Sequence, residues 1–288
     1  MSDNMAVTQT DRSGRLVLSE NLKLRIASGA VLAAMALGAA YAGPNSFAVL
    51  VLVIALFVSW EWGRMVRGAS ADLAFLIHAV AVTAAIGLAV AGYAALGAAV
   101  LVTAAIILVP LVFGRGARLS ALGVFYVGLP AISLLWLRAS EPYGFAAVLL
   151  VFAIVWGSDI GAYAAGRLIG GPRLWPSVSP NKTWAGLIGG LAAGTAAAAL
   201  VAPLAATEAS PLRLALTGLG LGVVAQAGDL AESALKRVFG LKDASDLIPG
   251  HGGFMDRMDS IVAVAVAAGL LALLVNAHAP AQALLFGS

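Results

Sequence analysis

Long apolar stretches separated by short polar breaks dominate the chain from Ile26 onwards. A stretch of about twenty apolar residues is long enough to cross a hydrocarbon core of about 30 Å as a helix. These stretches lack the alternation of polarity that is typical of transmembrane β-strands. The pattern therefore predicts an all-α, polytopic integral membrane protein with nine transmembrane helices, at residues 26–43, 47–62, 73–91, 95–113, 119–137, 145–165, 185–204, 212–231 and 260–277.

The breaks between these stretches carry residues that interrupt helices. They are Gly43-Pro44, the Gly-Arg-Gly segment at 114–116, Glu141-Pro142 and the proline-bearing stretch 171–180. The early stretches contain mainly small and aliphatic residues, which allow close helix packing but suggest no chemistry. We therefore expect three parts: a tail at 1–25, a transmembrane scaffold at 26–140 and a catalytic transmembrane region at 141–288.

Composition supports a lipid environment. The chain is 61% hydrophobic and 11% charged, whereas a soluble domain carries about a quarter charged residues. It has no cysteine, which excludes disulfides and thiolate metal ligands. The net charge of +3 raises the question of nucleic acid, but the basic residues are dispersed among short loops, so we expect membrane lipid and no nucleic acid as partner.

The basic residues also predict an orientation, because short cytoplasmic loops are enriched in Lys and Arg. With a cytoplasmic N-terminus, fifteen of the seventeen basic residues lie inside, leaving Arg138 and Arg213 outside. The polar interruptions 166–184 and 232–259 then share the cytoplasmic side, where they can meet. We expect a site that faces the cytoplasm, in a bacterial inner membrane.

The chemistry is concentrated in residues 228–260, which hold six acids, four basic residues and a histidine. Five polar residues at its start have the spacing i, i+3, i+4, i+7, i+8, which places them on one helix face. They are Asp229, Glu232, Ser233, Lys236 and Arg237. Carboxylates followed by cations suit a metal ion with phosphate oxygens above it.

A glycine-rich turn follows this helix. Lys242 and Asp243 lead to His251, Gly252 and Gly253. Glycine permits positive φ and lets backbone amides approach a ligand such as phosphate. We therefore expect this turn to contact substrate, while a purely structural role of His251 is an equal alternative.

Asp256 and Asp259 open the last span at spacing i, i+3. Capping of the helix is an alternative role for this pair, because the helix dipole stabilises acids at an N-terminus. A carboxylate at the centre of a membrane helix costs about 2.5–3.5 kcal/mol, so several acids together need a partner. Hard oxygen ligands without cysteine favour magnesium over zinc.

These residues carry a family resemblance. Its pattern is Ser233-Ala-Leu-Lys-Arg, four residues, Lys242-Asp243-Ala-Ser, two residues, and Ile248-Pro-Gly-His-Gly-Gly-Phe-Met-Asp-Arg-Met-Asp259. This resembles the complete signature of the phosphatidate cytidylyltransferases, also called CDP-diacylglycerol synthases. Trp156-Gly-Ser-Asp159 and Ser179-Pro-Asn-Lys-Thr-Trp184 extend the resemblance, but Ala185 stands where the family usually has glutamate.

The resemblance implies transfer of a cytidylyl group from CTP to phosphatidic acid, giving CDP-diacylglycerol and pyrophosphate. It implies Mg²⁺, with or without a second cation, held by the acids that match Asp229 and Asp256. The lipid phosphate is already an anion, so catalysis rests on positioning and charge neutralisation more than on a general base. The resemblance leaves a homodimer open.

We assign the site residues accordingly. The predicted catalytic residues are Asp229, Asp256, Lys236, Arg257 and Asp259. The predicted substrate-binding residues are Ser179, Asn181, Lys182, Thr183, Ser233, Arg237, Lys242, Asp243, His251, Gly252, Gly253 and Asp159. Ordinary positive-inside charge is the alternative for Lys236, Arg237 and Lys242.

For two further acids, Asp159 and Glu61, a structural role is considered. Asp159 has an alternative role in pairing with Arg167, two turns further along the same helix. Glu61 and Arg64, at spacing i, i+3, are expected to form an interfacial ion pair.

Three other functions remain open. A CTP-dependent polyprenol or phytol kinase would transfer the γ-phosphoryl group and release CDP instead of pyrophosphate. A cation-coupled transporter would favour broken helices in matching repeats, and no internal repeat is seen. A prenyltransferase would use Asp-rich magnesium motifs, for which one Asp-x-x-Asp is a weak signal.

Overall fold

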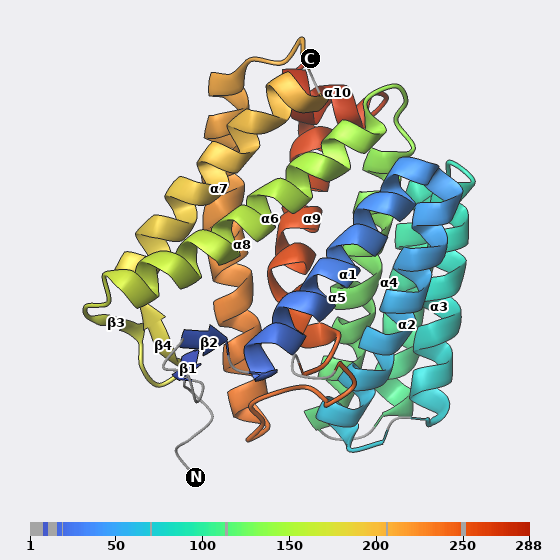
Figure 1. Cartoon of the computed structure of the whole chain (residues 1–288). Helices are drawn as coiled ribbons and strands as arrows, with labels where there is room; N and C mark the ends of the chain where they lie inside the picture. The colour runs from blue at the N-terminus through green and yellow to red at the C-terminus, as the bar shows by residue number, and fades with distance from the viewer. Residues whose placement is uncertain are drawn as a thin grey trace.

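A computed structural model describes residues 8–10, 16–18, 20–69, 71–112, 115–205, 207–248 and 252–288. Within these ranges, nine long helices and one short helix make up almost the whole structure (Figure 1). They are α1 (Glu20–Ala42), α2 (Pro44–Arg67), α3 (Leu73–Val90), α4 (Ala94–Leu111), α5 (Arg115–Arg138), α6 (Gly144–Leu168), α7 (Trp184–Ala205), α8 (Pro211–Val238), α9 (Met255–Asn276) and α10 (Pro280–Phe286).

These helices confirm the prediction of a polytopic helical membrane protein. In the described part of the chain, the eight helices from α2 to α9 are long and apolar enough to cross a membrane. Helix α1 contributes a shorter apolar segment, Ala27–Ala42. The predicted break at Gly43-Pro44 also holds, because Gly43 has φ 130° and Pro44 begins α2.

Successive long helices run in alternating directions, which brings alternate connections to the same end (Figure 1). The connection from α6 to α7 and the connection from α8 to α9 lie at the end where α1 begins. Arg138 ends α5 and Arg213 lies in the first turn of α8, both at the opposite end. The two polar interruptions therefore share one end, as the distribution of basic residues predicts.

Two short hairpins were not predicted. Strand β1 (Thr8–Thr10) pairs with β2 (Leu16–Leu18), and β3 (Arg173–Trp175) pairs with β4 (Ser179–Thr183). The second hairpin is antiparallel, with Arg173 opposite Thr183. The stretch expected to be a simple break between spans therefore folds back and delivers the Ser-Pro-Asn-Lys-Thr segment to the start of α7.

Helices α8 and α9 extend beyond the predicted membrane spans, 212–231 and 260–277, toward this shared end. Helix α8 continues to Val238, and α9 begins at Met255. The added turns are polar, so an apolar window stops short of them. Polar side chains of these turns find partners within the fold, among them Lys236 on α8 and Asp256 on α9.

Glycines let α6 and α7 pack at very short range. A Cβ atom on Gly161 would lie 2.6 Å from the carbonyl oxygen of Gly189. A Cβ atom on Gly157 would lie 2.8 Å from the Cβ of Ala197. Small residues at a helix interface allow such close backbone approach. The seam fixes the helix that carries Asp159 against the helix that follows Lys182.

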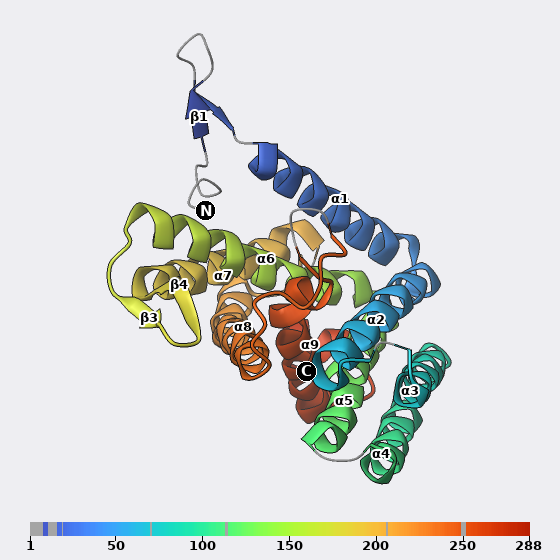
Figure 2. The ribbon, with the colours of Figure 1, turned by 90° about the horizontal axis from the view of Figure 1, so that it is seen from below.

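Helix α9 lies at the centre of the bundle, with α2, α5, α6 and α8 around it (Figure 2). Helix α8 approaches it closely at Gly228, where a Cβ atom would lie 3.1 Å from the carbonyl oxygen of Asp259 and 2.6 Å from the Cβ of Ala263. Asp229 is the next residue on α8. The acids of the last two long helices are therefore brought to the same end of neighbouring helices.

Candidate active site

Two lysines lie directly against the two acids that the sequence nominates as metal ligands. Lys182 Nζ is 2.5 Å from Asp229 Oδ2. Lys236 Nζ is 2.6 Å from Asp256 Oδ1 and 3.2 Å from Glu232 Oε1. Each ammonium group therefore neutralises a carboxylate that the sequence assigns to a metal cation.

The pair formed by Lys182 and Asp229 is partly open to solvent. Lys182 comes from β4 and Asp229 from α8, and their side chains are 20% and 25% exposed. The Ser233 hydroxyl donates a hydrogen bond of 3.4 Å to Asp229 Oδ1. Both side chains therefore reach solvent in part, but Lys182 Nζ itself is buried, with Asp229 as its ionic partner.

Asp256 is instead buried, and both of its oxygens are engaged. Oδ1 accepts from Lys236, while Oδ2 accepts from the backbone N–H groups of Ala244 at 2.9 Å and Gly253 at 2.8 Å. Both amides lie in the connection before α9, so neither bond is the helix cap considered as an alternative above. In this state Asp256 ties the connection between α8 and α9 to the first turn of α9.

The polar face of α8 is helical as predicted, but it divides between two neighbours. Glu232 and Lys236 face Asp256 on α9. Arg237 Nε donates 3.3 Å to the carbonyl oxygen of Val178, and Nη1 donates 3.0 Å to that of Leu241. Arg237 therefore links the hairpin of β3 and β4 to the end of α8.

Acids from α6 and α9 complete a three-helix cluster around Asp229. Asp159 and Asp259 each interact electrostatically with Asp229. Asp259 Oδ1 also accepts a hydrogen bond of 2.6 Å from the Ser260 amide. Among the described side chains Asp159 forms no ion pair with Arg167, so the alternative of pairing along α6 is not found.

The donor chemistry of this cluster fits Mg²⁺, because every side-chain ligand available is an oxygen. The arrangement differs from a preformed metal site. Among the acidic and histidine side chains that the structure describes, no three converge to hold an ion. The lysines lie there instead, so holding a metal requires that Asp229 and Asp256 exchange their ammonium partners.

In the segment before α7, two of the predicted substrate-binding residues, Asn181 and Thr183, accept hydrogen bonds from within the protein. The hydroxyl of Thr183 accepts a hydrogen bond of 3.0 Å from the Gly186 amide and so caps α7. The carbonyl oxygen of Asn181 accepts 3.1 Å from Arg173 Nη1. The Asn181 side chain is exposed and Ser179 is half-buried. Contact of these residues with substrate stays a prediction.

The connection between α8 and α9 contains a glycine with positive φ, as its glycine-rich sequence predicts. Gly252 has φ +82°, and a Cβ atom there would lie 2.9 Å from Asp256 Oδ2. The Gly252 carbonyl accepts 2.8 Å from the Ile248 amide. Lys242 and Asp243 are exposed on this connection, whereas His251 lies outside the described residues.

Sequence reasoning missed Glu61 on α2, which belongs to this region. Its side chain is fully buried and accepts hydrogen bonds from Phe254 N at 3.0 Å, Met255 N at 2.6 Å and the Ser245 hydroxyl. The expected ion pair with Arg64 is wrong for the described side chains. Arg64 instead lies over the Trp60 ring, 4.8 Å from its centroid. The available signal was a carboxylate within an apolar run, which is costly without a partner.

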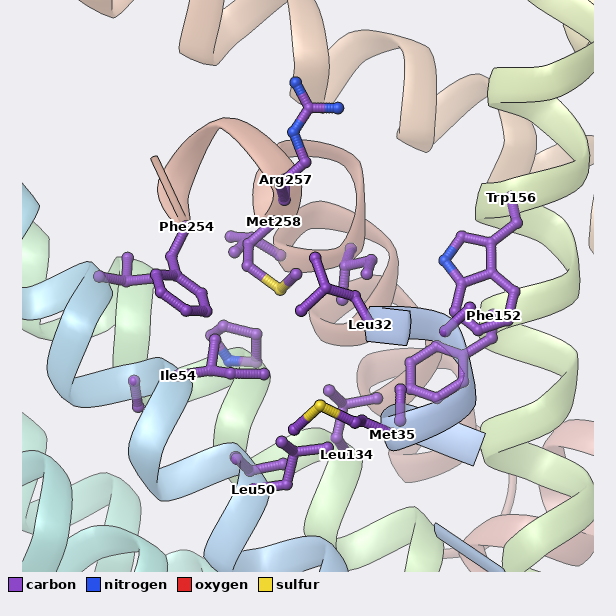
Figure 3. Close-up of a pocket in the computed structure, with 18 of the residues that line it drawn as sticks. Leu32, Met35, Leu50, Ile54, Leu134, Phe152, Trp156, Phe254, Arg257 and Met258 are labelled. Carbon is purple, nitrogen blue, oxygen red and sulfur yellow. The ribbon is translucent and has the colours of Figure 1, made fainter. Parts of the chain in front are cut away.

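A pocket of about 560 Å³ opens beside this region, between α1, α2, α5, α6 and α9 (Figure 3). Its walls are largely apolar, with Leu50 and Leu134 toward one end and the exposed Arg257 at the other. Asp159 also lines it. The volume is in the range of ligand pockets, about 300–1,000 Å³. An apolar cavity with charged groups at one end suits an amphiphilic ligand.

Comparison with known proteins points to one family. Residues 23–275 match the model of the Cytidylyltransferase family. The chain is 40% identical over 247 residues to the phosphatidate cytidylyltransferase of Brucella suis biovar 1, covering 85% of this chain and 91% of that protein. It is 38% identical over 265 residues to that of Pseudomonas aeruginosa, covering 87% and 97%. The similarity to that of Bacillus subtilis is 37% over 143 residues, about half of each chain.

Proposed function

The chain belongs to the cytidylyltransferase family, and we propose that its phosphatidate cytidylyltransferase reaction takes place where the lysine–carboxylate pairs adjoin the apolar pocket. The reaction gives CDP-diacylglycerol. CTP reaches this place from water and phosphatidate from the membrane. We place this end of the bundle in the cytoplasm of a bacterial cell, where CTP is available.

One observation carries this proposal: two chemically different surfaces meet at the same end of the bundle. The partly exposed side chains of Lys182 and Asp229 bring both charges to the end of the bundle that we place toward water. Asp159 interacts electrostatically with Asp229 and also lines the pocket, whose charged end holds Arg257. A soluble triphosphate and a lipid phosphate can therefore be brought together without moving either the nucleotide into lipid or the acyl chains into water.

The chemistry needs positioning more than proton transfer. A phosphatidate oxygen attacks the α-phosphorus of CTP, and a P–O bond forms there. The bond from the α-phosphorus to the oxygen of the β-phosphate breaks, and pyrophosphate leaves with the electron pair. Both reacting groups are anions, so cationic side chains that reduce their repulsion and hold them in line lower the barrier.

We assign the charge neutralisation to Lys182, Lys236 and Arg257. On substrate binding the two lysines turn from their carboxylates to phosphate oxygens, and Arg257 binds the lipid phosphate at the charged end of the pocket. Asp229 and Oδ1 of Asp256 would then be available to hold Mg²⁺. When bound, that ion supplies further neutralisation of the triphosphate.

The products test this proposal. Inside-out membrane vesicles that contain the protein, given phosphatidate and CTP, should incorporate label from the α-phosphate into lipid and release pyrophosphate. Label from the γ-phosphate should stay out of the lipid. Right-side-out vesicles should be inactive with external CTP, because CTP does not cross the bilayer. Reactions without phosphatidate provide the control, whereas CDP release with γ-label in lipid would identify a lipid kinase.

Filling the pocket should weaken lipid binding selectively. Ala36 of α1 lines the pocket, whereas Ala34, two residues away, is exposed and does not line it. We expect Ala36→Trp to raise KM for phosphatidate about tenfold, which corresponds to about two methylene groups losing apolar contact.

The KM for CTP should not change in the Ala36→Trp variant. Ala34→Trp, the matched control, should leave both constants unchanged in mixed-micelle kinetics. Equal effects of the two substitutions would place the acyl chains elsewhere.

A further inference from the structure

The Glu61 carboxylate joins α2 to the start of α9. It accepts hydrogen bonds from the amides of Phe254 and Met255 and from the Ser245 hydroxyl. Its side chain is 0% exposed, so these three groups, and not bulk water, are its donors. A buried carboxylate with fewer donors would carry a large desolvation cost. Glu61 is therefore matched to this one arrangement of the connection between α8 and α9.

Helix α9 needs such a partner, because it has no local N-cap side chain. Phe254 stands at the N-cap position and makes no side-chain cap hydrogen bond. The first N–H groups of a helix have no partner within it, and they carry the positive end of the helix dipole. Glu61 supplies charge-assisted hydrogen bonds to this end from another helix.

Packing on both sides keeps Glu61 in register with α9. One turn earlier on α2, the ring of Phe57 stacks on that of Phe254, with centroids 4.8 Å apart and an interplanar angle of 8°. One residue later, Trp62 Nε1 donates 2.9 Å to the Leu119 carbonyl on α5. Gly253 lies so close that a Cβ atom would be 2.8 Å from Cδ of Glu61.

Glu61 and Asp256 both bind groups of the same connection between α8 and α9. Asp256 binds the amides of Ala244 and Gly253, while Glu61 binds Ser245 and the two residues after Gly253. Asp256 also holds Lys236. We propose that Glu61 is a positioning residue for the transferase reaction, because it fixes the backbone that orients Asp256 and, through it, Lys236. This proposal rests on the proposed function.

Glu61→Gln tests it with little change in shape. The amide keeps one acceptor oxygen but loses the charge and the second acceptor, so Phe254, Met255 and Ser245 can no longer all be satisfied. We expect kcat to fall about 10- to 100-fold, the loss typical of mutating a group that orients the ligands of a metal site. The KM for CTP should stay within about threefold of wild type. Hydrogen exchange should become faster in peptides covering residues 252–258.

Glu208→Gln is the matched control, since Glu208 is an exposed acid at the opposite end of the bundle. It should leave kcat and exchange unchanged. Gly253→Ala pushes the backbone away from Glu61 while keeping the charge, so it should reproduce the loss of kcat. It also carries the test if Glu61→Gln fails to fold.

Unchanged kcat and exchange in folded Glu61→Gln would overturn the inference, as would full activity of Gly253→Ala. Failure of the wild-type protein to make CDP-diacylglycerol would instead overturn the proposed function. A loss that appears only as a higher KM for CTP would assign Glu61 to nucleotide binding and contradict a positioning role.

Discussion

Asp229→Asn should lower kcat by about 10³-fold while leaving the fold intact, as expected when a group that stabilises the reacting charges is lost. Its side chain is 25% exposed and contacts Lys182 and Ser233, so asparagine fits in the same space. What is lost is the charge that attracts a cation. Turnover of the purified variant at saturating Mg²⁺ and its thermal melting profile measure the two effects separately.

The double variant with Lys182→Ala separates two roles of Asp229. If Asp229 holds a metal, Asp229→Asn with Lys182→Ala will be no more active than Asp229→Asn alone. Recovery of activity in the double variant would show that Asp229 serves only to neutralise Lys182. Substantial turnover of Asp229→Asn itself would refute the metal assignment.

Asp256→Asn should combine a similar loss of turnover with a loss of stability. Asp256 is 7% exposed and accepts from Lys236, Ala244 and Gly253. Removing one partner of a buried ion pair typically costs about 3–5 kcal/mol. We therefore expect kcat to fall about 10³-fold and the melting temperature in detergent to drop clearly below that of Asp229→Asn.

The contrast between the two variants provides the control for Asp256. Both lose one negative charge at the same end of the bundle, but only Asp256 is buried with both oxygens engaged. Wild-type melting of Asp256→Asn would contradict the structural role. Nearly normal turnover would remove Asp256 from the chemistry.

The sequence predicts the fold well where one physical effect dominates. Apolar stretches of sufficient length must be helices in lipid, because every backbone polar group needs an internal partner. The basic residues of short loops then group the connections by side, with Arg138 and Arg213 at the other end. For the same reason, acids within the last polar segment were recognisable as a site: they are costly there unless they serve a purpose.

Partners across the fold were beyond the sequence. The bond from Phe254 to Glu61 joins residues 193 positions apart, and no local pattern relates them. The ion pair of Lys182 with Asp229 likewise depends on the hairpin of β3 and β4, which the residues of this segment did not predict. Charge patterns show which residues are expensive to bury, but the folded chain alone shows which charges satisfy each other.

The glycine seam between α6 and α7 has a mechanical consequence. Helices whose backbones touch over several turns cannot tilt or slide past each other without steric overlap. The two helices therefore move as one rigid unit. Asp159 lies on α6, and the hairpin that bears Lys182 connects α6 to α7. Lys182 therefore follows a bound nucleotide mainly through the flexibility of its own side chain. Any larger displacement during a catalytic cycle must come from the elements packed against α6 and α7.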